Sequence, residues 1–410
     1  MRKNSPQAPK RLQNLRDNQW EFHLRTFATS LVEDGYTDRT VQEKLRLLAR
    51  LGRWLQSTKL SITDLNERLL EAFLKRKPRA GSGDLRTLQQ FLDHLQRQKV
   101  VPAPNLPREN SPLAHILSQY ETHLRTERGL VAYTIRRHQF FARKFLLERF
   151  RGQPLHLKAV KASDISDFIL RHTPRMGAQR AQAMTSAFRS FFRFLFQKGE
   201  LQANLAASVP TVANWRLSTV PKYLARKEVK RVLKACDRRT AVGRRDYAIL
   251  LLLARLGLRA GEVVRLQLED INWRAGEILI RGKGLLHDRM PLPADVGEAL
   301  ASYLRRDRPA CRTRRVFVCT NAPRRGFAHP STLSKIVRRT LARADLHPPL
   351  KGAHVLRHSL ATSMLHSGAT MGEIGEVLRH RDPKTTEIYA KVDFESLRSL
   401  AQPWPMGGVR

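Results

Sequence analysis

The sequence predicts a multi-domain, mainly α-helical protein whose C-terminal domain is α+β with a small antiparallel sheet. Through the first half, apolar residues recur at helical spacing, as in "RTVQEKLRLLARLGRWL" at 39–55. Two linker-like segments interrupt these helical blocks. After the second linker, "GEILIRGKGLLHDRMPLP" at 275–292 holds two β-rich runs around a Gly/Asp turn, which predicts a hairpin.

Changes in composition along the chain set the expected domain boundaries. The segment "VPAPNLPRENSP" at 101–112 holds four prolines, which fix φ and remove backbone donors, so it is typical of a linker. The segment "VPTVANWRLSTVPKYL" at 209–224 is interpreted in the same way. We therefore expect an N-terminal helical domain at 1–100, a linker at 101–111, a second helical domain at 112–208, a linker at 209–224, an α+β domain at 225–395 and a tail at 396–410.

The two helical domains share a sequence theme. The stretch 30–55 resembles 123–149, with Gly35 and Thr40 opposite Gly129 and Thr134. Further on, "FLDHLQRQKVV" at 91–101 falls opposite "FFRFLFQKGEL" at 191–201. This order of elements indicates that 1–100 duplicates the domain at 112–208. The alternative, that any two amphipathic helix pairs look alike, stays open at this point.

The α+β domain follows from its own local patterns. The apolar runs around "RRDYAILLLLARLG" (244–257) and "STLSKIVRRTLARAD" (331–345) predict helices. The short run "RRVFVCT" at 314–320 predicts a further short strand.

Charge is the strongest compositional signal. The 410 residues include 75 Lys+Arg against 36 Asp+Glu, a formal net charge of +39. A solvated surface does not require such an excess, whereas a polyanionic partner does, and the preference for arginine suits phosphate oxygens. An anionic membrane is the alternative partner, but no amphipathic terminal helix or lipidation signal supports it. Duplex nucleic acid is the expected partner.

Other features place the protein in a reducing cytoplasm, associated with the nucleoid. No apolar run reaches the roughly 20 residues of a membrane span. The basic N-terminus has no apolar stretch behind it, unlike a secretory signal. The three cysteines (Cys236, Cys311 and Cys319) are scattered and form no CxxC pair. His366 and His380 could suggest a metal site, but no pair of such residues has ligand spacing with a carboxylate, so we expect neither a metal nor another cofactor.

The polar motifs of the C-terminal domain suit one style of phosphate chemistry. Enzymes act on DNA phosphates either through two metal ions held by carboxylates or through cationic side chains and a protein nucleophile. Carboxylates are sparse near these motifs. The set that they do contain suits the second style and comprises Arg259, Lys283, His354, Arg357, His380 and Tyr389.

Four ordered motifs carry a family resemblance. They are "LGLRAGEVVRL" (256–266), "RGKGLLHDRMPL" (281–292), "HVLRHSLATSMLHSGA" (354–369) and "LRHRDPKTTEIYAKV" (378–392). In order and spacing they resemble the tyrosine recombinase/phage integrase family, with the closest likeness to Xer-like and transposon-encoded members. The match covers about 222–395, and 112–208 looks like the family's SAM-like core-binding domain. The resemblance implies a site-specific DNA recombinase or integrase.

The resemblance assigns a role to each residue of the set. Arg259 and Arg357 would bind the non-bridging phosphate oxygens, with Glu262 orienting a basic side chain. Lys283 would protonate the leaving 5′-oxygen, with Lys351 and Arg281 as the nearest substitutes. His354 would share the tyrosine proton or bond the phosphate, and His358 would give structural support. His380 would be the third phosphate contact, although Arg379 stands where the family usually has glycine, which leaves the local backbone or an added phosphate contact open.

Tyr389 is the expected nucleophile. Its attack would leave a 3′-phosphotyrosyl bond and a free 5′-hydroxyl, and a second 5′-hydroxyl could reverse the step without ATP. Neighbouring cations would favour the phenolate, whose pKa is ordinarily about 10. Other tyrosines lack any such motif around them; they include Tyr120, Tyr223, Tyr247 and Tyr303.

The family also implies how the protein would act on DNA. The domain at 112–208 and the catalytic domain would close around duplex DNA, and a homo- or hetero-tetramer would form the synapse, with a second recombinase as a possible partner. The tail around "DFESLRSLAQPWP" (393–405) would dock on the next protomer or fold back on its own domain. Charge alone suggests phosphate contacts from Arg136, Arg137, Arg143, Arg180, Arg189 and Arg193.

Two other functions compete with recombination. A type IB topoisomerase shares the chemistry, but the motif wording, the tail and the core-binding domain argue against it. An architectural DNA-binding protein would need neither Tyr389 nor Lys283. Integration, transposition and resolution are all open as biological roles.

Overall fold

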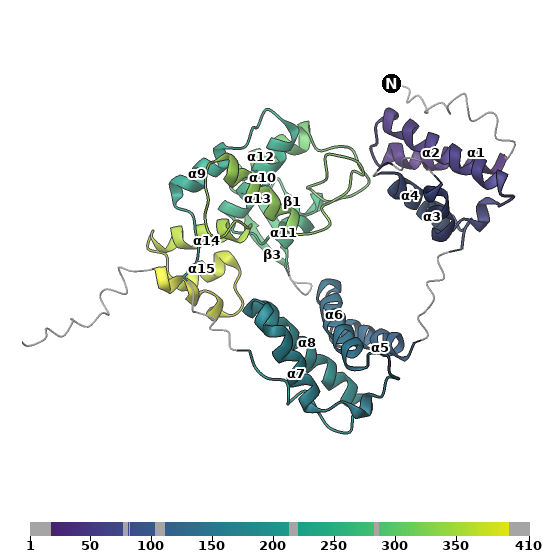
Figure 1. Ribbon diagram of the computed structural model, residues 1–410. Coiled ribbons are helices and arrows are strands. Elements are labelled where there is room, and N and C mark those ends of the chain that lie inside the picture. The colour runs from purple at the N-terminus through teal and green to yellow at the C-terminus, as the bar shows by residue number, and fades with distance from the viewer. Residues whose placement is uncertain are drawn as a thin grey trace, which may run out of the picture. The chain divides into compact units, whose positions relative to one another are not determined.

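The computed structural model describes residues 18–76, 81, 83–102, 111–212, 220–282 and 287–392 (Figure 1). Three predictions lie partly or wholly outside these residues: Lys283, most of the two linkers, and the tail. The chain divides into two compact units, one of Met1–Val101 with Thr219–Arg410 and the other of Pro102–Ser218.

The N-terminal part of the first unit is a bundle of four helices around its own core. Trp20, Leu48 and Phe91 are buried at its centre. Helix α2 has a wide apolar stripe toward this core and a polar outer face. The elements are α1 (Asn18–Glu33), α2 (Asp38–Ser57), the 3-10 helix η2 (Ile62–Asp64), α3 (Glu67–Lys75) and α4 (Asp84–Arg97).

The second unit is also a helical bundle with a separate, aromatic core. Phe145, Phe168, Phe188 and Phe192 pack edge to face within it. Its elements are α5 (Pro112–Thr126), α6 (Ala132–Arg149), η3 (Leu157–Ala159), α7 (Ala162–His172), η4 (Thr173–Arg175) and α8 (Ala178–Gln197).

The C-terminal part of the first unit is mostly helical and carries the predicted sheet. Its core centres on α10, which is buried nearly all round. The helices and 3-10 segments are α9 (Arg226–Lys234), α10 (Ala241–Arg255), α11 (Ala260–Arg265), η5 (Leu268–Asp270), α12 (Ala294–Arg306), α13 (Ser331–Arg343), α14 (His354–Leu365), α15 (Met371–Leu378), η6 (Pro383–Thr385) and η7 (Glu387–Val392).

The sheet has three antiparallel strands in the order β1-β2-β3. The predicted hairpin forms β2 (Glu277–Arg281) and β3 (His287–Pro291), with Leu279 opposite Arg289. Strand β1 (Ile271–Asn272) adds to β2, an element that the sequence patterns did not indicate. The prediction of a short strand at 314–320 is wrong. That run forms only single bridges, Gln267 with Arg315 and Val318 with Gly326.

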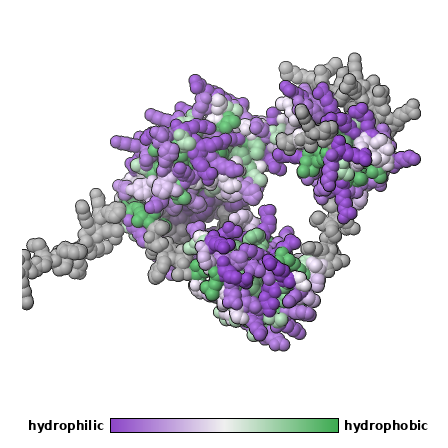
Figure 2. All heavy atoms as spheres, viewed as in Figure 1, coloured by the Kyte–Doolittle hydropathy of each residue, from purple (hydrophilic) through white to green (hydrophobic). Residues whose placement is uncertain are grey.

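The surface agrees with the composition. In the view of Figure 2, hydrophilic side chains cover most of each part, and hydrophobic ones form small scattered patches. Among the described residues, no helix combines the length and the hydrophobicity that crossing a bilayer requires.

Candidate active site

Four elements of the C-terminal part position the predicted polar residues. The loop after α10 carries Arg259, helix α14 carries His354, Arg357 and His358, the end of α15 carries His380, and η7 carries Tyr389. Both Arg357 and Arg259 lie near enough to Tyr389 to lower its pKa. The structure therefore brings these residues into one cluster, while Lys283 falls outside the described residues.

Arg357 is a buried cross-link between two helix ends. Arg357 is only 3% exposed. Its guanidinium donates to the Gly257 carbonyl, just after α10, and to the Leu378 carbonyl at the end of α15. Carbonyls at helix C-termini lack intrahelical partners, so a cation is well placed there. Burial and the nearby guanidiniums of Arg259 and Arg379 lower the pKa of Arg357 to about 10, so it stays charged at neutral pH.

Gly257 allows this close approach. Its φ of +58° lies in the left-handed region. A Cβ there would come within 2.7 Å of a methyl group of Leu378 and 3.0 Å of one of Leu360. Any other residue at 257 would therefore both strain the backbone and push α14 and α15 away.

Glu262 is a buried carboxylate shared by two arginines. It accepts bonds from the Arg259 backbone N–H (2.8 Å), from Arg259 Nη1 (2.8 Å) and from Arg379 Nη2 (2.9 Å). Burial alone would raise the pKa of this carboxyl, but these bonds and the two positive charges hold it below its ordinary value. The Arg259 side chain is 41% exposed, so one face of its guanidinium is open to a ligand.

Arg379 adopts the backbone conformation that the family glycine would adopt. It ends α15 at φ 55° and ψ 50°, the left-handed region, which costs a non-glycine residue about 1 kcal/mol. Its side chain is only 9% exposed and turns inward to Glu262. The backbone at this position keeps the tight helix end, and the added guanidinium binds a carboxylate of the protein.

Tyr389 is buried and bonded to a histidine of α14. It is 2% exposed, and its hydroxyl lies 2.9 Å from His358 Nδ1. Burial raises the pKa of Tyr389 to about 12, even though Arg357 and Arg259 act in the opposite direction. The tyrosine is therefore a neutral phenol, because burial outweighs the cations that the sequence motifs place around it.

His358 is poised to accept a proton. Burial, His354 and Arg357 lower its pKa to about 4, so the imidazole is neutral at physiological pH. A neutral ring whose Nδ1 accepts from Tyr389 carries its own proton on Nε2. The sequence motifs gave His358 only a supporting role and placed proton sharing at His354. His354 lies one turn earlier with an exposed side chain, its ring centroid 6.1 Å from that of His358.

His380 is fixed by two hydrogen bonds. Its backbone N–H donates to the Gly375 carbonyl (2.8 Å), and its Nδ1 lies 2.9 Å from the hydroxyl of Thr386. Burial and the guanidiniums of Arg357, Arg259 and Arg379 lower its pKa to about 4. Thr386 was not singled out in the sequence, although the pair of threonines before Tyr389 was a visible signal.

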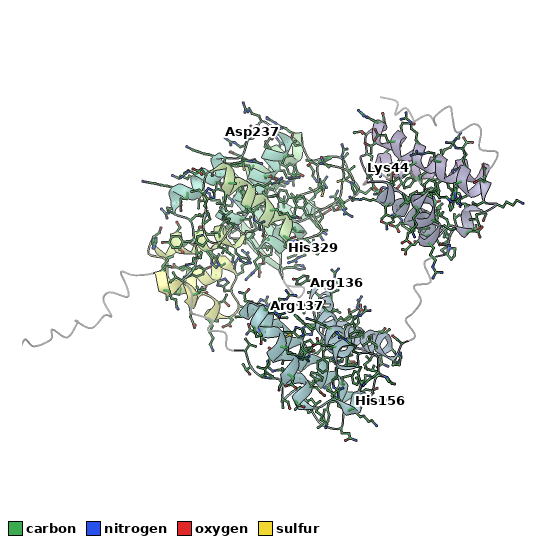
Figure 3. The ribbon with its side chains drawn as sticks, viewed as in Figure 1. Lys44, Arg136, Arg137, His156, Asp237 and His329 are labelled. Carbon is green, nitrogen blue, oxygen red and sulfur yellow. The ribbon has the colours of Figure 1, made fainter. Side chains whose placement is uncertain are left out.

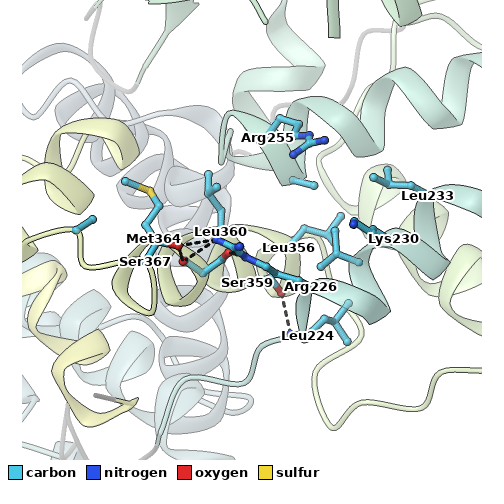
Figure 4. A pocket seen from close by; sticks show the side chains of 14 residues that line it. Leu224, Arg226, Lys230, Leu233, Arg255, Leu356, Ser359, Leu360, Met364 and Ser367 are labelled. Atoms are coloured by element: carbon cyan, nitrogen blue, oxygen red, sulfur yellow. Dashed lines mark hydrogen bonds between the residues drawn. The ribbon is translucent and has the colours of Figure 1, made fainter. Parts of the chain in front are cut away.

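A separate hollow of about 520 Å³ lies on the other side of α14, between α9 and α10 (Figure 4). Arg226 reaches across it to the hydroxyl of Ser367 (2.6 Å), and the Leu224 N–H donates to the hydroxyl of Ser359 (2.8 Å). None of the predicted site residues lines it. These contacts anchor the outer face of α14 and so support the face that carries His354, Arg357 and His358.

The second unit presents most of its candidate phosphate contacts at the surface. Arg136 and Arg137 project from α6 (Figure 3), and Arg180 and Arg193 are exposed on α8. Arg189 is different, because its guanidinium donates to the carbonyls of Val209 and Pro210. It holds the chain segment after α8 and is less available to DNA.

Comparisons with known proteins identify the family of the chain. Residues 222–396 match the model of the phage integrase family. The chain is 44% identical to the putative integrase/recombinase y4rA of Sinorhizobium fredii, over 94% of both chains. It is 32% identical to the tyrosine recombinase XerD of Ralstonia nicotianae, over 62% of this chain and 83% of that one.

Solved structures share the fold. A XerH site-specific recombinase bound to its difH substrate matches with a TM-score of 0.55 and 21% identity, over 70% of this chain and 84% of that one. A lambda integrase dimer bound to a core site matches with a TM-score of 0.52 and 17% identity, over 72% and 99%. The mainly helical fold with a small antiparallel sheet is therefore confirmed.

Proposed function

The chain belongs to the phage integrase family of tyrosine recombinases, enzymes of site-specific DNA recombination, and on this premise we propose how its own residues cut and rejoin DNA. The observation that carries the proposal is the buried Tyr389 hydroxyl, bonded to a neutral histidine and surrounded by arginines. This arrangement gives one nucleophile, one proton acceptor and several phosphate-binding cations.

The phosphate would be held by Arg259, Arg357 and His380. Arg259 has an exposed guanidinium face, and Glu262 fixes its orientation. With Nδ1 of His380 engaged by Thr386, its Nε2 is the ring atom left to meet a phosphate oxygen. Preorganised cations of this kind stabilise the extra negative charge that develops on phosphorus in the transition state.

The chemical step would exchange one phosphodiester for another. The Tyr389 oxygen bonds to phosphorus, and its proton passes to Nδ1 of His358. The bond between phosphorus and the 5′-oxygen breaks, leaving a 3′-phosphotyrosyl bond. The 5′-oxygen leaves with a proton, which we assign to Lys283 on the family resemblance. A phosphate in the site would also bring negative charge to the cluster, which favours protonation of the neutral histidines.

Binding would involve both units of the chain. We propose residues 112–208 as a core-binding domain that contacts duplex DNA through exposed arginines of α6 and α8, with residues 225–395 as the catalytic domain. Lambda integrase has been solved as a tetramer bound to a Holliday junction. We propose that four chains likewise form the synapse here, alone or with a second recombinase, in the cytoplasm at the nucleoid. The biological role would be integration, transposition or resolution.

The test is capture of the covalent intermediate. A randomised pool of nicked duplexes is incubated with the protein, and complexes that survive denaturation are digested with protease and sequenced. We expect adducts attached at Tyr389 by mass spectrometry, and none from Tyr389→Phe, which keeps DNA binding. Tyr223→Phe, a matched control at an exposed tyrosine, should form adducts normally. Adducts from Tyr389→Phe would refute the assignment, and relaxation of supercoiled DNA without two-site recombination would indicate a topoisomerase.

A further inference from the structure

The helices before residue 102 repeat the arrangement of those after residue 111. In both stretches, two helices lead into a short 3-10 turn and then into two more helices: α1, α2, η2, α3, α4 and α5, α6, η3, α7, α8, with η4 added before α8. Two or three residues after the first and the last helix of each stretch comes a left-handed residue, Gly35 and Lys99 in one, Gly129 and Gly199 in the other.

The buried positions of the two stretches also correspond. Aligning Gly35 with Gly129 pairs α2 with α6, and aligning Lys99 with Gly199 pairs α4 with α8. Both members of each pair are buried, which two unrelated amphipathic bundles would not produce at so many places. The pairs include Val41–Ile135, Leu48–Ala142, Leu51–Phe145, Leu88–Phe188, Phe91–Phe191, Leu92–Phe192, Leu95–Leu195 and Val101–Leu201.

The outer face of α2 carries a row of arginines. Arg39, Arg46, Arg50 and Arg53 are all exposed. Their spacings of seven, four and three residues place them on one side of a helix, over about 21 Å. Arg39 pairs with the exposed Glu43 (3.1 Å). Among the described residues, the other three have no hydrogen-bond or ion-pair partner, so these three are free to bind an anion.

The fold itself does not require this row. In α6, the matching positions hold Tyr133, Phe140, Lys144 and Leu147, three of them apolar. The same bundle therefore forms with a different outer face. Cations that the bundle does use are turned inward instead: Lys44 of α2 donates to Thr87 and Gln90 at 2.9 Å each, and burial lowers its pKa.

We propose that residues 18–101 are a second copy of the helical module at 111–209, and that the arginine row of α2 gives this copy its own contact with duplex DNA. This inference rests on the proposed function only in taking DNA as the partner. A row of about 21 Å faces about six phosphates of one strand at 3.4 Å per residue along the axis. Arginine forks suit such oxygens.

Charge favours DNA over a second copy of this chain as the occupant. Every copy carries a formal net charge of +39, so two copies repel one another, while duplex DNA carries one negative charge per about 1.7 Å. The added contact is tethered to the contacts of the other domains. It therefore raises affinity through effective concentration without forming a further active site.

The test measures how DNA affinity depends on salt in the full-length protein. The variant Arg46→Glu/Arg50→Glu/Arg53→Glu is titrated onto a long mixed-sequence duplex at a series of KCl concentrations. Each phosphate contact contributes about 0.9 to the slope of log K against log salt. For the glutamate variant we expect the magnitude of the slope to fall by roughly 3, with an unchanged melting temperature. The variant Arg46→Lys/Arg50→Lys/Arg53→Lys should keep most of the wild-type slope.

A matched control carries the same charge change on another helix of the same domain. In Arg68→Glu/Lys75→Glu/Arg76→Glu the exposed cations of and just after α3 are reversed, and the slope should stay near that of the wild type. An equal loss in both variants would show a general charge effect and refute the proposal. An unchanged slope with lost self-association in ultracentrifugation would assign the row to a second copy. Adduct formation at Tyr389 on the nicked pool is measured in parallel. This measurement distinguishes a failure of the proposal for the arginine row from a failure of the proposed active site.

Discussion

Arginine is used in opposite ways at the two ends of the first unit. In the candidate active site, Arg357 and Arg379 are 3% and 9% exposed and are bonded to carbonyls and to a carboxylate. On α2, Arg46, Arg50 and Arg53 are exposed and have no partner among the described residues. The buried pair carries charge and also holds chain segments together, while the exposed row only adds positive charge to the surface. Substitutions should therefore affect folding and chemistry at the first place, and salt-dependent binding at the second.

The largest effect is expected at Arg357. In Arg357→Lys, one ammonium replaces a planar fork and cannot reach both the Gly257 and Leu378 carbonyls. We expect covalent adduct formation to slow by roughly 100- to 1,000-fold in single-turnover assays. The melting temperature should also drop, because a buried carbonyl left without a donor costs about 1–3 kcal/mol of stability. A variant with wild-type rate and stability would show that the buried charge has no architectural role.

The burial of His358 among cationic groups should make the stability of the protein depend on pH. The pKa of His358 is about 4 in the folded protein and about 6.5 when unfolded, so the unfolded chain binds more protons between these values. The free energy of unfolding should fall as pH drops from about 6.5 to 4, by about 3 kcal/mol for this histidine. In His358→Asn the fall, measured by urea denaturation at each pH, should be smaller by that amount. An identical pH profile in the two proteins would contradict the buried, neutral imidazole.

The smallest effect is expected at Arg379, where two contributions oppose each other. Arg379→Gly removes the left-handed strain but also the ion pair with Glu262, whereas Arg379→Ala loses the ion pair and keeps the strain. The alanine variant should therefore be less stable than the glycine variant by about 1 kcal/mol. Equal stability of the two variants in chemical denaturation would mean that the end of α15 is not held in the left-handed conformation.

The sequence was informative where a short motif specifies both the residue and its local structure. Helical periodicity predicted the bundles, the Gly/Asp turn predicted the β2–β3 hairpin, and the ordered motifs predicted the family. It failed where a contact depends on distant chain segments. The run at 314–320 is rich in β-branched residues, yet it pairs only through single bridges, and β1 is too short to show a pattern.

The details of the site were less accessible for the same reason. The bond from Tyr389 to His358 depends on how η7 packs against α14, which no local spacing encodes. The inward turn of Arg379 depends on Glu262, far away in the chain. The domain boundaries and the roles of the individual site residues stay predictions, to be decided by the experiments above.

The left-handed end of α15 has an evolutionary consequence. Most arginine codons differ from glycine codons only in their first base, so a single nucleotide change converts one residue into the other at position 379. Glycine satisfies the backbone without strain, and arginine repays part of its strain through Glu262. Glycine and arginine at position 379 are therefore one mutation apart. With arginine, Glu262 has a second cationic partner, and with glycine it has only Arg259.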